Sequence, residues 1–395
     1  MSMRCSVCGF DHKNLVIDFK DIPLCDALKH SKQEAKQVTK YPVEVVNCPS
    51  CGHAELIIKP PEEEIYSNYT YRTSLSPTLD EHFDKYSVDL ISLYQKTNGE
   101  HPELNFLDIG GNDGVLANKL ARKGHKTYIV DPSPTALLCD KNITVINNYF
   151  DDTQAELLKE EVGQFSLITC NNCLANIRDL TRFAKNASSL LKSNGIICVE
   201  TGYIKHQIET KTIEMINHEH YHYFSINSLK KLFGQYGVSL CKWEFIKTKG
   251  GSIRFWGIND NGNKNNEQSV QLPNEELNSN SLQEYISLRK KEISNITRGK
   301  QLSFFGSSAG STILTYVFGL ENQVSEVIDD NESRHGKYMP GTGARVISPS
   351  SWYKQDDQVC INFAWRFGGM IKSRHSQNKD NNHRIVDIIE SSDKK

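Results

Sequence analysis

Residues 217–225, Asn-His-Glu-His-Tyr-His-Tyr-Phe-Ser, bring three histidines and a glutamate together. Such a stretch could be a metal site, an acid–base site, a nucleic-acid patch or an ordinary solvated loop. Nucleic acid would require lysines and arginines, which the stretch lacks. On a strand, His218 and His220 would share a face and could bind a metal together with His222. Because histidine exchanges protons near neutral pH, we favour the acid–base site, with His220 as the base and Glu219 orienting it or the substrate.

Four of the eleven cysteines form two CxxC pairs, Cys5 with Cys8 and Cys48 with Cys51. A CxxC turn places two thiolates on one side of a tight loop, and two such turns together make a tetrahedral four-sulfur site that suits Zn²⁺. A redox dithiol is the alternative, but it would usually carry a single CxxC beside a βαβ unit. Four cysteine ligands leave no open coordination position, so the pattern predicts a structural zinc.

Residues 104–131 predict a nucleotide-binding unit. An apolar strand over 104–109 leads into a glycine-rich turn and a helix, and a second strand over 126–130 ends at Asp131, where an acid can accept hydrogen bonds from a ribose. This pattern alone also fits NAD. The carboxylate of Asp108 would repel a pyrophosphate but can hold the cationic amine of S-adenosylmethionine (SAM), so we predict SAM. The expected cofactor contacts are Asp108, Gly110, Asn112, Gly114, Asp131 and Asn171.

Two further apolar segments, 165–172 and 195–200, predict the fourth and fifth strands of the same domain. Strands that alternate with helices imply a mostly parallel sheet that binds ligands at its carboxyl edge. The histidine-rich stretch follows the fifth strand, so we expect it at that edge. The polar run 259–271 predicts a loop or linker before a C-terminal domain.

The whole chain suggests two to three domains in its 395 residues. Lys and Arg number 46 against 48 Asp and Glu, a net charge of −2, which gives no electrostatic reason to expect a nucleic acid or an anionic membrane as partner. The sequence has no run of about 18 apolar residues and no secretory signal. We expect a cytoplasmic protein that acts on a small molecule; its oligomeric state is left open, with a monomer favoured.

Ordered motifs along nearly the whole chain resemble the three-domain sugar C-methyltransferases that act on nucleotide-linked 4-keto-deoxysugars. Besides the four cysteines, they are residues 69–76, 108–114, 200–203, 218–220, 250–255, 305–311, 329–331, 337–342 and 363–365. The resemblance implies an α/β fold: a small zinc-binding module (1–65), a class I, Rossmann-like methyltransferase domain (66–258) and a C-terminal α/β, Rossmann-like domain (259–395).

The resemblance also implies the chemistry. The sugar nucleotide would lie between the methyltransferase domain and its flanking domains. A base would remove a proton next to a ketone, and the enolate would attack the methyl group of SAM. The catalytic residues it implies are Tyr69, Tyr71, Glu219 and His220. We expect substrate contacts from Asn176, Tyr203, Asn217, His218 and Arg254, the last as a bidentate phosphate ligand.

The sequence departs from the family pattern at three places. Asn217 stands where a tyrosine is usual, Asn176 where a histidine is usual, and the loop 306–311 lacks a lysine. Asparagine cannot act as a general base near neutral pH. Two alternatives therefore stand beside carbon methylation: O-methylation of a sugar or another small polar acceptor, and a non-catalytic SAM-binding homologue.

Overall fold

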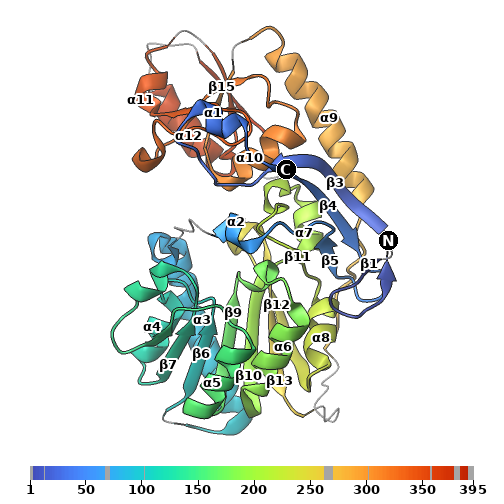
Figure 1. Cartoon of the computed structure of the whole chain (residues 1–395), viewed down its shortest axis with the longest axis vertical. Helices are drawn as coiled ribbons and strands as arrows, with labels where there is room; N and C mark the ends of the chain where they lie inside the picture. The colour runs from blue at the N-terminus through green and yellow to red at the C-terminus, as the bar shows by residue number, and fades with distance from the viewer. Residues whose placement is uncertain are drawn as a thin grey trace.

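The computed structural model of the chain describes residues 3–12, 14–66, 72–101, 103–261, 270–300, 302–355, 358–377 and 383–389. A large lower domain (cyan to yellow in Figure 1) and a smaller upper domain (orange to red) are stacked along the long axis, and the blue N-terminal strands run along one side of both. None of the described helices is long and apolar enough to cross a membrane.

The large domain is built on a seven-stranded sheet. Its strands are β6 (Asn105–Ile109), β7 (Lys126–Val130), β8 (Thr144–Ile146), β9 (Phe165–Asn171), β10 (Leu191–Gly202), β12 (Val238–Ile246) and β13 (Ser252–Asn259). Their spatial order is β12-β13-β10-β9-β6-β7-β8, and only β13 runs antiparallel to its neighbours. This confirms the class I methyltransferase fold. The fifth strand, β10, starts at Leu191, before the expected start at 195, with a register shift between Leu191 and Ile196.

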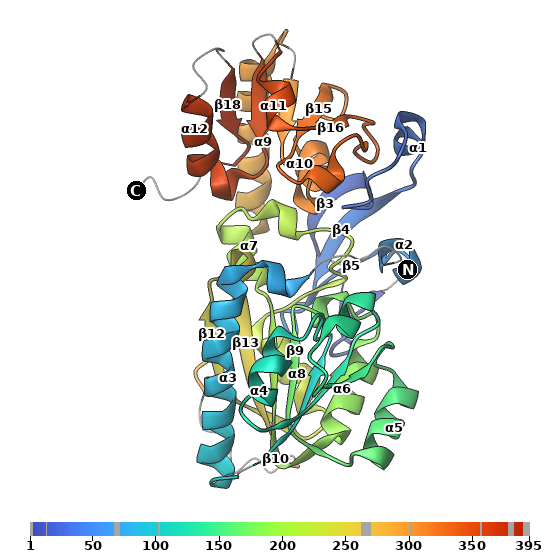
Figure 2. The same ribbon diagram turned by 90° about the vertical axis from the view of Figure 1, so that its left-hand side faces the viewer.

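Helices cover both faces of this sheet, as Figure 2 shows. One face carries α3 (Pro77–Asn98) and α4 (Val115–Ala121); the other carries α5 (Asp152–Glu161), α6 (Leu180–Ser189) and α8 (Ile226–Gly234). Helix α3 starts at the N-cap Ser76, whose side chain accepts from the amide of Leu79, and has Pro77 in its first turn. Its apolar side chains recur at helical spacing, so α3 buries one stripe against the sheet: Leu79, Phe83, Tyr86, Leu90 and Tyr94.

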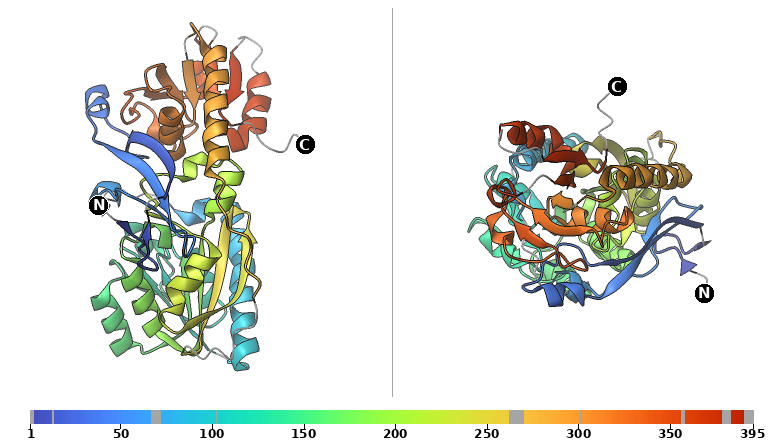
Figure 3. Two further views of the ribbon diagram at one scale, coloured as in Figure 1. Left: turned by 90° about the vertical axis from the view of Figure 1, so that its right-hand side faces the viewer. Right: turned by 90° about the horizontal axis from the view of Figure 1, so that it is seen from above.

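The N-terminal module has two small sheets. The first pairs β1 (Met3–Arg4) with β2 (Asp11–His12); the second contains β3 (Asn14–Pro23), β4 (Lys40–Asn47), β5 (Ala54–Leu56) and β11 (His222–Tyr223), in the order β11-β5-β4-β3. Its helices are α1 (Lys32–Lys36) and α2 (Glu62–Tyr66). Because β11 comes from the histidine-rich stretch, the module and the methyltransferase domain share a sheet. The long strands β3 and β4 extend from there to the C-terminal domain (Figure 3).

The C-terminal domain is a second Rossmann-like unit. All five strands of its sheet are parallel, in the order β16-β15-β14-β17-β18. The elements are α9 (Ser279–Thr297), β14 (Leu302–Phe305), α10 (Ala309–Val317), β15 (Val324–Ile328), β16 (Arg345–Ile347), α11 (Pro349–Trp352), β17 (Val359–Asn362), α12 (Gly368–Ser376) and β18 (Arg384–Asp387). Of the predicted linker 259–271, residues 262–269 lie outside the described residues. The short helix α7 (Ile204–Glu209) lies between the methyltransferase domain and the C-terminal domain (Figure 1).

Candidate active site

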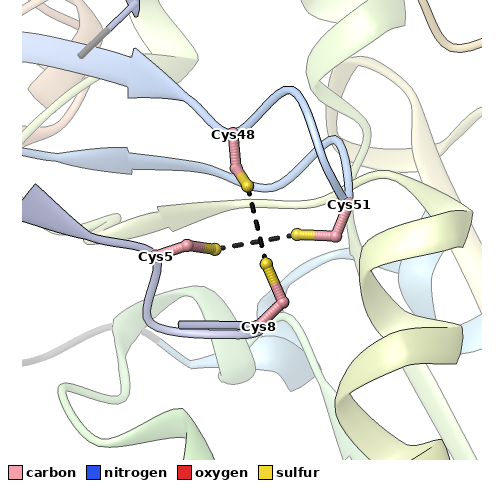
Figure 4. A group of neighbouring side chains, drawn as sticks. All are labelled: Cys5, Cys8, Cys48 and Cys51. Carbon is pink, nitrogen blue, oxygen red and sulfur yellow. Dashed lines mark hydrogen bonds between the residues drawn. The ribbon is translucent and has the colours of Figure 1, made fainter. Parts of the chain in front are cut away.

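The four cysteines of the two CxxC pairs converge on one point (Figure 4). The Sγ atoms of Cys5 and Cys51 lie 3.6 Å apart, as do those of Cys8 and Cys48, and all four lie within 4.8 Å of one another. A tetrahedral Zn²⁺ with Zn–S bonds of about 2.3 Å has sulfur–sulfur distances of roughly 3.8 Å, so the four sulfurs fit the ion without rearrangement. The cysteines are not disulfide-bonded. They form a closed four-sulfur zinc site.

A cavity of about 900 Å³ opens at the carboxyl ends of β6, β7 and β9, where a parallel sheet binds its ligand. Four of the six predicted cofactor residues line it: Gly110, Asn112, Asp131 and Asn171. The carboxylate of Asp131 is oriented by two backbone amides, since Asn112 N donates to it at 2.9 Å and Ser133 N at 2.8 Å. Gly110 has φ +73°, and a Cβ there would lie 2.5 Å from Cys173 Sγ. We refer to this space as the donor cavity.

The donor cavity has the chemistry that SAM requires. Both amide atoms of Asn171 are buried without a hydrogen-bond partner among the described residues, as expected of a side chain that binds a ligand. Asp108 lies in an adjoining pocket, and burial raises the pKa of its carboxyl to about 7 despite the hydrogen bond from Thr169 Oγ1 at 2.6 Å. A cationic amine beside it would restore the carboxylate form. Gly114 is in none of these linings. It has φ +76°, and a Cβ there would lie 2.6 Å from Cys139 Sγ, so its role is in the turn.

A second cavity, of about 510 Å³, lies between the methyltransferase and C-terminal domains. Asn217, Glu219 and His220 line it on one side, and the loop after β14 and residues after β15 line it on the other. Asn172, Asn176 and Lys249 line both this cavity and the donor cavity, so the two spaces meet there. We call it the acceptor cavity, because a methyl acceptor bound in it would lie next to the cofactor.

The histidine-rich stretch is a turn up to residue 220, and only His222–Tyr223 is a strand. The turn is stabilised by Asn217 Oδ1, which accepts from the amide of Glu219 at 2.9 Å. This excludes the alternative of a metal site at 218, 220 and 222, because the three imidazoles point to three different partners. His218 Nε2 bonds the carbonyl of Tyr41, His220 Nδ1 that of Met215, and His222 Nδ1 bonds His53 Nε2.

His220 lines the acceptor cavity, and one of its ring nitrogens is fixed by a hydrogen bond. Its Nδ1 lies 2.9 Å from the carbonyl oxygen of Met215, so Nδ1 carries the proton and Nε2 the lone pair. Burial lowers the pKa of His220, which favours the neutral form. The Met215 carbonyl orients the imidazole ring, and the role of Glu219 in orienting His220 or the substrate stays a prediction. Burial raises the pKa of Glu219 to about 7, so its carboxyl is itself able to exchange protons near neutral pH.

Three residues expected to contact substrate do not line either cavity. His218 is fully buried against β4. Tyr203 is buried near Glu275. Desolvation is the main cause that raises the pKa of the Tyr203 hydroxyl, and the carboxylate of Glu275 raises it further. Arg254 faces Glu200 across the β10–β13 pair, with Nη2 2.8 Å and Nε 3.1 Å from Oε2 of Glu200. Because the guanidinium of Arg254 donates to the Glu200 carboxylate, the prediction that Arg254 binds a phosphate was wrong. Tyr69 and Tyr71 lie outside the described residues.

A buried network beside the zinc site escaped the sequence-based predictions. His53, Glu55 and His222 offer three atoms within 4.8 Å of one another. The ammonium of Lys59 lies 2.9 Å from Glu55 Oε2 and 3.4 Å from His222 Nε2, so it already supplies the positive charge that a metal would bring. Glu55 also accepts from the amide of Ser6 at 2.9 Å, next to Cys5. The network thus joins the zinc module to both cavities, because Lys59 lines the donor cavity and His222 the acceptor cavity.

Known proteins match this architecture along the chain. Three family models match in order: "Putative zinc binding domain" over residues 5–66, "Methyltransferase domain" over 80–242 and "C-methyltransferase C-terminal domain" over 247–389. The C-methyltransferase NovU of Streptomyces niveus is 24% identical over 403 residues, which cover 97% of this chain and 94% of NovU. The chain belongs to the three-domain C-methyltransferase family. It is a SAM-dependent methyltransferase with a structural zinc site.

Other methyltransferases are similar to a part of this chain. The ubiquinone biosynthesis O-methyltransferase of Xanthomonas euvesicatoria pv. vesicatoria is 29% identical over 112 residues, which is 27% of this chain and 47% of that protein. The crystal structure of magnesium protoporphyrin IX methyltransferase from Synechocystis PCC 6803 with bound SAH is 15% identical, with a TM-score of 0.35, over 50% of this chain and 91% of that one.

Proposed function

We propose that this enzyme transfers the methyl group of SAM to a carbon next to the ketone of a nucleotide-linked deoxysugar. The observation that carries the proposal is the pair of cavities that meet at Asn172, Asn176 and Lys249, with His220 in the acceptor cavity and not in the donor cavity. When bound, SAM supplies an electrophilic methyl group at that junction. The family models and NovU favour carbon as the acceptor atom.

The C-terminal side of the acceptor cavity supports a nucleotide-linked acceptor. There the chain repeats the nucleotide-binding pattern: β14, a glycine turn at Gly306 with φ +98°, helix α10, then β15 and Asp329. Asp329 accepts from the amide of Ser307 at 2.8 Å, an arrangement that suits a ribose contact. The amino end of α10 faces the cavity through Ser308 and Gly310, and unpaired amides at a helix start favour a diphosphate.

His220 Nε2 would remove the proton from the carbon next to the ketone, and the resulting enolate carbon would attack the sulfonium methyl. Asn176 Oδ1 has no hydrogen-bond partner among the described residues and lines both cavities, so we assign it to a hydroxyl of the sugar. Asn217 shapes the turn that presents Glu219 and His220. Tyr69 and Tyr71 stay predicted catalytic residues. The domain boundaries after residues 65 and 258 and the cytoplasmic location also stay predictions.

The experiment is a turnover assay of the purified full chain with SAM and a panel of nucleotide-linked sugars with and without a ketone. We expect S-adenosylhomocysteine to form only with keto-sugars and the product to show a carbon-bound methyl signal by NMR. In deuterated water without SAM, the enzyme should exchange the proton next to the ketone. An oxygen-bound methyl would establish the O-methyltransferase alternative, which the two asparagines, Asn176 and Asn217, keep open. No turnover with any keto-sugar would refute the proposal.

A further inference from the structure

The junction of the two cavities contains one charged residue. Of the described residues, Asn172, Asn176 and Lys249 line both spaces. The methyl group must pass from one cavity to the other, so these three side chains flank the transfer point. Neither asparagine can carry a charge or exchange a proton near neutral pH. Lys249 is therefore the group whose charge acts where the acceptor meets the cofactor.

The position of Lys249 is set by the backbone and by packing. It lies in the tight turn Thr248–Gly250 between β12 and β13, with φ +48° and ψ +38°. This left-handed conformation is uncommon for a residue with a Cβ, so the surrounding structure must hold it in place. The next two residues are glycines with φ +79° and +101°, and a Cβ on them would lie 2.7 Å from Arg366 Nη2 and 2.0 Å from His206 Cδ2. The close approach of these side chains holds the turn against the cavity wall.

The surroundings of Lys249 are acidic on the acceptor side. The side chain of Lys249 is exposed where it faces the two cavities. Because protein surrounds those cavities, desolvation lowers the pKa of the Lys249 ammonium. The carboxylates of Glu200 and Glu219 oppose that shift and favour the charged form. Glu219 also lines the acceptor cavity, next to the proposed base, His220. The cation therefore lies close to the place where the acceptor loses its proton.

We propose that Lys249 Nζ donates a hydrogen bond to the ketone oxygen of the acceptor and stabilises the negative charge that develops there. The inference rests on the proposed carbon methylation. His220 Nε2 takes the proton, the C–H electron pair forms the carbon–carbon double bond, and the carbonyl π pair moves to the oxygen held by Lys249. The enolate carbon then bonds the methyl, and the S–CH₃ bond breaks to give S-adenosylhomocysteine. Lys249 supplies a positive charge at this junction, where Asn176 replaces the histidine that is usual in the family pattern.

The test compares Lys249→Met and Lys249→Arg with the matched control Lys247→Met, an exposed lysine in neither cavity lining. With S-adenosylhomocysteine bound, the exchange of the proton next to the ketone is followed in deuterated water, and SAM affinity is measured by calorimetry. Loss of one donor to a developing oxyanion costs about 10²–10³ in rate. We expect that loss for Lys249→Met, a loss below about tenfold for Lys249→Arg, and none for Lys247→Met. SAM affinity should be unchanged in Lys247→Met, and in the two Lys249 variants it should change by much less than the exchange rate falls in Lys249→Met.

Two results would overturn the inference while the proposed function stands. The first is proton exchange in Lys249→Met at the wild-type rate. The second is a loss of SAM affinity in Lys249→Met as large as the loss in exchange rate, which would make Lys249 a cofactor ligand. Absence of exchange and methylation in the wild-type enzyme with every keto-sugar would instead remove the proposed function, and the role of Lys249 with it.

Discussion

Replacement of His220 by asparagine would remove one proton acceptor and keep the contact that holds the side chain. The amide nitrogen of asparagine is as many bonds from Cα as Nδ1 of histidine, so it can donate to the Met215 carbonyl that Nδ1 now contacts at 2.9 Å. What the variant lacks is Nε2 with its lone pair. The fold and the turn 217–220 should therefore survive the change.

The loss of a general base costs about 10²–10⁴ in rate. In this cavity Glu219, with a pKa of about 7, can accept a proton in its place. We therefore expect the lower half of that range for His220→Asn, a decrease in kcat of about 10²–10³, or roughly 2.7–4 kcal/mol in activation free energy. SAM affinity should not change, because His220 does not line the donor cavity.

The matched control is His218→Asn, two residues away and outside both cavity linings. His218 is buried, and its Nε2 lies 3.0 Å from the carbonyl oxygen of Tyr41 in β4. Losing that contact should lower the free energy of unfolding by about 1–3 kcal/mol and leave kcat unchanged. Steady-state kinetics and thermal unfolding on both variants separate the two effects. Equal decreases in kcat would mean that the turn is structural. A fully active His220→Asn enzyme would refute the role of His220 and point to Glu219, Tyr69 or Tyr71.

Three further predictions concern the zinc, the cofactor and the pH dependence. Cys8→Ser should lose about one Zn²⁺ per chain by metal analysis and lower the Tm, since Cys8 Sγ lies 3.6 Å from Cys48 Sγ; full zinc content in the variant would contradict this. Asp131→Ala should weaken SAM binding by about 1–3 kcal/mol in calorimetry, because it removes a charged acceptor in the donor cavity; equal affinities would exclude the ribose contact. Glu219 is protonated below about pH 7 and a carboxylate above it, so kcat/KM should rise through about pH 7, and Glu219→Gln should remove that rise; an unchanged profile would show that the carboxylate is not needed.

Local sequence signals account for the parts of the structure that depend on neighbouring residues. The two CxxC turns predicted the zinc site, because each pair sets its own geometry within four residues and only their meeting had to be assumed. The strand expected at 126–130 is β7, which ends directly before Asp131, since an apolar run bounded by polar residues needs little tertiary information. The alternation of strands and helices likewise predicted the sheet and the edge at which its ligands lie.

The partners of the site residues depended on the tertiary structure. Strand β11 pairs with β5, and His222 bonds His53 across 169 residues of sequence, which no periodicity could predict. Arg254 was expected at a phosphate, but it lies opposite Glu200 in the sheet, and the low dielectric of the interior favours that pairing. Lys249 carried no motif that distinguished it from the other lysines. It became a candidate because the donor and acceptor cavities meet beside its turn. A sequence pattern reports whether a residue is buried, whereas the identity of its neighbour is decided when distant elements pack together.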